Sequence, residues 1–326
     1  MASPLDSVPS VVAPADAPSP STRGAGAVGL VVGALLSGPF GGAVAALLFP
    51  RVGVDGVVTL RLTIAALLLL AVCRPRVRGY RRADWWWIGG FGAALAGMNT
   101  LAYHAIALIP LGTVVMLEVL GPLALSVVTA RRAVSWLWAG LAAAGVALLS
   151  STGFDRLTPA GIGFAAGAGA VWAGYIVAGA RVGQRFPQAD GLALAMTAAA
   201  VSTLPFGAGT AGTTLLSPYI LAMGAAVALL SSALPYTLEL LALRRMPTTT
   251  FAVLMSLGPA VAATAGYLVL HQQPTPVEGL AIALVVAANI GAVRTPSRRV
   301  LSPMTHTPRE STPAGATRSA EGCRSC

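Results

Sequence analysis

Ten predominantly apolar stretches fill the chain from Gly26 to Val293, and this repetition constrains the fold more than any other feature. About 20 apolar residues in an α-helix are enough to span the hydrocarbon core of a bilayer. We therefore predict an all-α membrane protein with ten transmembrane helices and almost no room for a soluble domain. The predicted spans are residues 26–49, 54–73, 85–108, 111–130, 134–151, 160–181, 190–206, 217–241, 247–270 and 276–293.

The positions of the arginines predict how these helices are oriented. All 21 basic residues are arginines. Apart from Arg51, Arg61 and Arg156, every one lies on the N-terminal arm or after an even-numbered span. Loops on the cytoplasmic side carry an excess of Lys and Arg. The pattern predicts a multi-pass protein of the cell membrane with both termini in the cytoplasm.

The composition excludes several other classes of protein. Charged residues make up 10% of the chain, whereas soluble globular proteins contain about 25%. The net charge of +10 is typical of some nucleic-acid-binding proteins, but these arginines are dispersed through short loops, so we expect no nucleic-acid partner. No phosphate-binding loop or nucleophile–base set appears, so we predict that the protein is not an enzyme.

The two ends of the chain have a different composition. Residues 1–25 are rich in Pro, Ala and Ser and lack the pattern of a signal peptide, which predicts a disordered cytoplasmic arm. Residues 295–326 predict a disordered cytoplasmic tail in the same way. The tail ends in Cys323 and Cys326, which are too few ligands for a zinc site. We therefore expect free thiols, no metal and no cofactor.

The sequence contains an internal repeat. The pattern P-x-x-T-x-x-x-L-x-x-L-G-P occurs at residues 110–122 and again at residues 247–259. Each copy belongs to a group of five spans, residues 26–151 and 160–294, and an odd number of spans inserts the second group upside down. Inverted repeats recur in secondary transporters, which hold the substrate near the midplane between the halves.

The stretches 98–123 and 234–270 resemble the two repeats of EamA-type permeases of the drug/metabolite transporter superfamily. Within it they are most similar to the threonine/homoserine exporter subgroup. The resemblance implies export of amino acids or related metabolites, coupled to proton entry. The subgroup's second repeat usually carries an acid before the proline, in an M-x-x-E-P-A pattern. Here that position is Gly258, so a role for an acid there is not carried over.

Two ionisable residues fall inside predicted spans near mid-depth, and such residues are costly in a membrane and usually functional. Arg61 and Glu118 are each the eighth residue of their spans, about 11 Å below the outer ends. Equal depth permits a salt bridge between them. One interpretation is that Glu118 exchanges a proton with the substrate while Arg61 holds a substrate carboxylate. The other is a permanent ion pair that fixes helix packing.

Further candidates lie in spans 3, 4, 8 and 9. Asn99 and Tyr103 are one helical turn apart and either line a pathway or tie helices together. Glu239 is either a pathway residue or the partner of Arg244 at the membrane interface. The remaining candidates are breaks or hinges in helices: Pro235 with its neighbour Tyr236 in an L-P-Y-x-L-E pattern, and the prolines of the repeated motif, Pro122 and Pro259.

These observations predict a secondary active transporter that exports threonine-like or homoserine-like amino acids, or related small metabolites, by proton antiport. Its expected partners are a small-molecule substrate, protons and the lipid bilayer, and the sequence leaves open whether it forms a homodimer. The alternatives are uptake, transport of a drug-like or nucleotide-linked metabolite, and a non-transporting membrane sensor or assembly protein.

Overall fold

A computed structural model describes residues 20–75, 79–130, 133–150, 157–186 and 190–294, and these residues are helical apart from short connections. Nine helical stretches among them are long and apolar enough to cross a membrane, and Val134–Leu149 is a shorter apolar helix. The prediction of an all-α fold with ten membrane helices is therefore confirmed. In chain order the helices are α1 (Pro20–Ala46), α2 (Phe49–Cys73), α3 (Arg82–Leu108), α4 (Leu111–Ala130), α5 (Ala133–Ser150), α6 (Pro159–Arg185), α7 (Asp190–Ala211), α8 (Pro218–Ala228), α9 (Leu234–Leu243), α10 (Thr248–Met255), α11 (Gly258–Leu270) and α12 (Pro276–Arg294).

The start of the chain differs from the prediction in two places. Helix α1 begins at Pro20, so the last residues of the predicted disordered arm 1–25 are helical. Helix α2 begins at Phe49, although residues 50–53 were predicted to be a connection. Pro50 lies in the first turn, where a helix needs no N–H from it. The helix is interrupted instead at Gly53, whose φ is 69°. The tail 295–326, with its two cysteines, lies outside the described residues.

Two predicted spans are not single helices. Span 217–241 is helix α8, a π-helical turn labelled η2 (Leu229–Ala233), and helix α9. A 3-10 turn, η1 (Gly212–Leu216), precedes it. Span 247–270 is divided between α10 and α11, with Pro259 in the first turn of α11. The two motif prolines therefore lie in different places, Pro122 inside helix α4 and Pro259 at the start of a helix, and their role as hinges stays a prediction.

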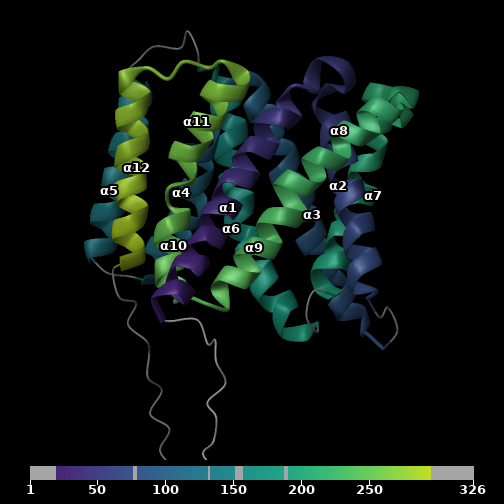
Figure 1. The fold of residues 1–326 in the computed structure, drawn as a ribbon, viewed down its shortest axis with the longest axis horizontal. Helices are drawn as coiled ribbons and strands as arrows, with labels where there is room; N and C mark the ends of the chain where they lie inside the picture. Colours follow the sequence, from purple (N-terminus) through teal and green to yellow (C-terminus); the bar gives the residue numbers. More distant parts are fainter. Residues whose placement is uncertain (1–19, 76–78, 131–132, 151–156, 187–189, 295–326) are drawn as a thin grey trace, which may run out of the picture. The chain divides into compact units, whose positions relative to one another are not determined.

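The helix contacts occur in pairs related by the repeat. The contact of α3 with α6 corresponds to the contact of α9 with α1. In the same way, the contact of α4 with α6 corresponds to the contact of α11 with α1. Helix α2 packs along α7, and α5 packs along α12 on the other side of the bundle (Figure 1). Exchanging the first five spans with the last five reproduces this set of contacts, as two inverted repeats require. The exact limits 26–151 and 160–294 stay a prediction.

Arginine-bearing helix ends gather on one face. Arg185, at the end of α6, donates from Nη1 to Asp84 Oδ1 at 3.1 Å, at the start of α3. The guanidinium carbons of Arg181 and Arg185 lie 5.3 and 5.7 Å from the centre of the Trp87 ring. The arginines after spans 2 and 6 therefore share one membrane face, as predicted. That this face is cytoplasmic stays a prediction.

Two glycines bring α4 and α6 into backbone contact next to a candidate site residue. A Cβ atom added at Gly121 would lie 1.8 Å from the carbonyl oxygen of Gly169, and one at Gly169 would lie 2.6 Å from that of Glu118. Small residues permit such approach between membrane helices. The depth and rotation of Glu118 are therefore set by a glycine crossing.

Candidate functional site

A cavity of about 300 Å³ lies between the two halves of the bundle. It is bordered by α1 to α4 from the first half, and by α6, η2, α9, α10 and α11 from the second. Residues that the sequence placed on five different spans meet here, namely Arg61, Asn99, Tyr103, Glu118, Pro235, Glu239 and Gly258. The side chain of Tyr236 lies outside the described residues. Pro122 and Pro259 are not among the residues that line this cavity.

Arg61 is the most extensively bonded side chain of the cavity. Its Nε donates to Ser232 Oγ at 3.3 Å, and its Nη2 donates to the Ser231 carbonyl at 3.0 Å. Its Nη1 donates to Asn99 Oδ1. All three acceptors are neutral, so no anion is hydrogen-bonded to the guanidinium.

Asn99 and Tyr103, which share one face of α3, both hold this guanidinium in place. Asn99 donates from Nδ2 to the Leu95 carbonyl at 2.8 Å, which turns its Oδ1 toward Arg61. The Tyr103 ring lies 5.3 Å from the guanidinium carbon, within the range of a cation–π interaction. The Tyr103 hydroxyl is buried and has no hydrogen-bond partner among the described residues.

Pro235 explains why a backbone carbonyl is available to Arg61. In an α-helix the N–H of each residue bonds to the carbonyl four residues earlier. Pro235 has no N–H, so the carbonyl of Ser231 lacks this bond, and Arg61 Nη2 donates to it instead. This contact is consistent with the helix break predicted at Pro235.

The π-helical turn leaves a second carbonyl for a side chain. In the turn, the N–H of Leu234 bonds to the Leu229 carbonyl, five residues back. This shift takes away the Leu234 N–H, from which the Leu230 carbonyl would accept in an α-helix. The Leu230 carbonyl accepts a hydrogen bond from the Ser37 hydroxyl of α1 instead. Helices α1 and α2 therefore both bond to the irregular backbone before Pro235.

Glu118 enters the same cavity from α4 but does not form an ion pair with Arg61. In the described part of the chain, no carboxylate oxygen lies within 4.0 Å of the Arg61 guanidinium. The sequence permitted a salt bridge on grounds of depth alone. The structure does not contain it; Asn99, Ser231 and Ser232 accept from three of the five guanidinium N–H groups instead. A permanent Arg61–Glu118 pair is therefore not what holds these helices together.

Glu239 enters the cavity from α9. Its alternative role as the interfacial partner of Arg244 is not supported, since no ion pair joins these two described residues. By the alignment of the two repeats, Glu118 corresponds to Met255 and Glu239 corresponds to Ala102, and all four line the cavity. Each half of the molecule thus contributes one acid to the cavity, and the equivalent position in the other half is apolar.

Some contributors were not expected from the sequence. Trp172 and Ser231 line the cavity and Ser232 accepts a hydrogen bond from Arg61, but all three were overlooked. Two adjacent serines shortly before a proline in an apolar span could have indicated this site. Outside this cavity, His104 Nε2 lies 3.7 Å from Asp55 Oδ1, and His104 Nδ1 lies 2.9 Å from the Thr100 carbonyl oxygen.

Comparison with known proteins agrees with this architecture. A sequence model of the EamA-like transporter family matches residues 159–294. The threonine/homoserine exporter RhtA of Escherichia coli (strain K12) is 40% identical over 257 residues, which cover 78% of this chain and 87% of that protein. This chain belongs to the EamA-like transporter family. The exporter of the same name from Salmonella typhimurium (strain SL1344) is also 40% identical over 257 residues.

One solved crystal structure, titled only as that of a protein, has a fold similar to that of this chain. That protein is 20% identical in sequence, and the comparison covers 85% of this chain and 99% of the other with a TM-score of 0.54. Together with the apolar helices, the family relationship makes this chain a multi-pass membrane transporter.

Proposed function

We propose that this protein exports threonine-like and homoserine-like amino acids from the cell in exchange for protons. The proposal is supported by the identity to exporters of that name over most of both chains. The observation that carries it is the Arg61 guanidinium, which lines a central cavity and has only neutral acceptors. The cavity volume, about 300 Å³, is at the lower end of the range for small-molecule sites.

Arg61 is suited to bind the carboxylate of an amino acid. A guanidinium has five N–H donors in a planar fork. Three bonds to neighbours fix its orientation, and the second hydrogens of Nη1 and Nη2 are left for a ligand. A cation inside a membrane protein normally pairs with an anion. The substrate carboxylate would supply that anion through short, charge-assisted hydrogen bonds.

Glu118 is suited to couple substrate binding to a proton. An ionised carboxylate accepts hydrogen bonds from the substrate ammonium, whereas a protonated carboxyl loses that charge and becomes a donor. Ammonium and proton therefore compete for the same oxygen atoms. If the substrate binds from the cytoplasm and the proton arrives from outside, this competition produces antiport. Glu239 offers a second carboxylate from the opposite half.

The rest of the cavity favours a small, uncharged substrate side chain. Gly258 and Met255 line the place where the subgroup's second repeat usually carries an acid. That place carries no charge, which suits a short hydroxyl-bearing side chain.

The proposal is tested by an efflux screen in cells that lack their own exporters for these amino acids. Cells that produce the protein should release threonine and homoserine faster than cells that produce Arg61→Gln at an equal level in the membrane. Lysine should not be released faster. Release of drug-like or nucleotide-linked compounds without threonine or homoserine would contradict the proposed substrate class.

A further inference from the structure

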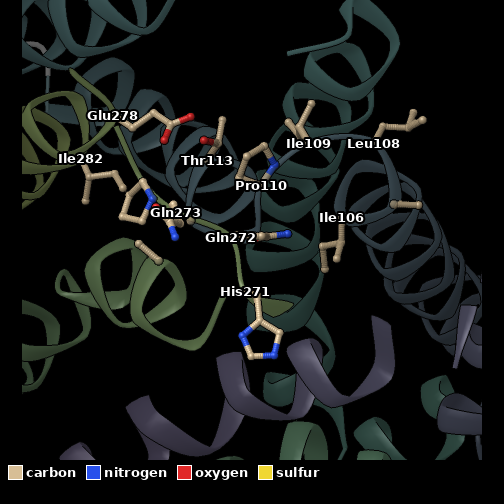
Figure 2. A pocket seen from close by; sticks show the side chains of 14 residues that line it. Ile106, Leu108, Ile109, Pro110, Thr113, His271, Gln272, Gln273, Glu278 and Ile282 are labelled. Atoms are coloured by element: carbon tan, nitrogen blue, oxygen red, sulfur yellow. The ribbon is translucent and has the colours of Figure 1, made fainter. Parts of the chain in front are cut away.

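A second cavity, of about 410 Å³, lies at the ends of α3 and α11 that are remote from the arginine-bearing loops. Its walls are the turn between α3 and α4 and the connection between α11 and α12, as Figure 2 shows. Ile106 lines this cavity and also the central one. The two cavities therefore adjoin at one side chain, on the side from which an exported molecule would leave.

The charged group of this cavity is a buried carboxylate. Glu278 is only 5% exposed, and its carboxylate points toward Thr113 across the cavity (Figure 2). Its Oε2 accepts a hydrogen bond from the Thr275 N–H at 2.8 Å, while the Glu278 N–H donates to Thr275 Oγ1 at 3.2 Å. This reciprocal pair is a capping box at the start of α12.

The cap and the positive end of the α12 dipole both favour an acid at this position, but neither supplies a counter-ion for it. A glutamine serves in a capping box as well as a glutamate does. In the described part of the chain, no arginine or histidine nitrogen lies within 4.0 Å of the Glu278 carboxylate. A buried charge without a counter-charge is costly, so this carboxylate favours a cationic ligand.

We propose that the second cavity is an exit site that binds the ammonium group of the departing amino acid at Glu278. This inference rests on the proposed export function. The central cavity holds the carboxylate end at Arg61, and the exit site, which shares Ile106 with it, offers the opposite charge at Glu278. The hydroxyl of Thr113 and the amides of Gln272 and Gln273 line the site as neutral hydrogen-bonding groups.

The test is Glu278→Gln in proteoliposomes, because this change keeps the cap and the size of the side chain but removes the charge. Exchange of radiolabelled threonine is measured with the substrate varied on one side at a time. The KM on the side of the exit site should rise about tenfold, which corresponds to about 1.4 kcal/mol. The KM on the arginine-rich side should change less than twofold. A KM that the substitution leaves unchanged on both sides would overturn the proposal.

Two controls distinguish the loss of an ammonium ligand from a folding defect and from the loss of a bound metal cation. The thermal unfolding midpoint of Glu278→Gln should match that of the original protein, whereas Glu278→Ala should unfold earlier because it loses the cap. Replacing sodium by choline should leave the exchange unchanged. If exchange requires sodium and Glu278→Gln removes that requirement, the site holds an inorganic cation and the ammonium proposal is wrong. If the unmodified protein exchanges no threonine or homoserine, the proposed function itself has failed.

Discussion

Replacing Gly121 by alanine should destabilise the protein through a single backbone clash. The new Cβ atom would lie 1.8 Å from the Gly169 carbonyl oxygen, although contacts under 3.0 Å essentially never occur. Helices α4 and α6 must therefore move apart to accommodate it. Overpacking a well-packed core costs about 1–3 kcal/mol, and a rigid backbone obstacle indicates the upper end of this range. A loss of about 3 kcal/mol lowers the folding equilibrium constant about a hundredfold.

The repeat supplies a matched control for this substitution. Gly258 occupies the equivalent position in the second motif, and a Cβ atom there would lie 3.9 Å from Val115, in ordinary contact. Thermal unfolding of purified Gly121→Ala and Gly258→Ala should therefore show a large decrease in the midpoint for the first and little change for the second. Gly121→Ala should also lose transport, because Glu118 lies one turn away on α4. Equal unfolding midpoints for the two variants would refute the glycine-crossing argument.

Three further predictions concern the central site and the topology. Arg61→Lys should insert normally but raise the KM for threonine at least about tenfold, because an ammonium lacks the planar fork; an unchanged KM in a transport assay would exclude Arg61 as the carboxylate ligand. Pro235→Ala restores an N–H that competes with Arg61 for the Ser231 carbonyl. Transport should therefore fall, while the unfolding midpoint stays equal or rises. Normal transport would show that the contact between Arg61 and Ser231 is dispensable. In a cysteine-free background, a cysteine at Arg245 should resist an impermeant thiol reagent in intact cells and a cysteine at Gln273 should react, and the reverse pattern would contradict the orientation.

Much of the fold was predictable because a bilayer leaves few options for long apolar stretches. The ten helices and the paired contacts of the two halves follow from apolar length and the repeated motif. The breaks in the helices were harder to predict from the sequence. The π-helical turn before Pro235 depends on Ser37 and Arg61, which lie far away in the sequence and satisfy its carbonyls. Local sequence does not reveal such partners.

The sequence predicted many of the residues that line the central site, but not the hydrogen bonds and ion pairs that they form. Arg61, Asn99 and Glu118 were recognisable because polar residues inside apolar spans are rare. The depths of Arg61 and Glu118 permitted a salt bridge, but rotation about the helix axes decides the contact, and the Gly121–Gly169 crossing sets that rotation for α4. Ser231 and Ser232 were not singled out, because serines are common in membrane helices.

The central claim is that Glu118 exchanges a proton for the amino acid held in the cavity. It is tested most directly by threonine efflux from proteoliposomes under an imposed pH gradient, with the external side acidic. The unmodified protein should release threonine faster as the gradient increases. Glu118→Gln, which keeps size and hydrogen bonding but cannot ionise, should reconstitute equally well and show no response to the gradient. A Glu118→Gln protein whose threonine efflux still follows the pH gradient as before would contradict the account.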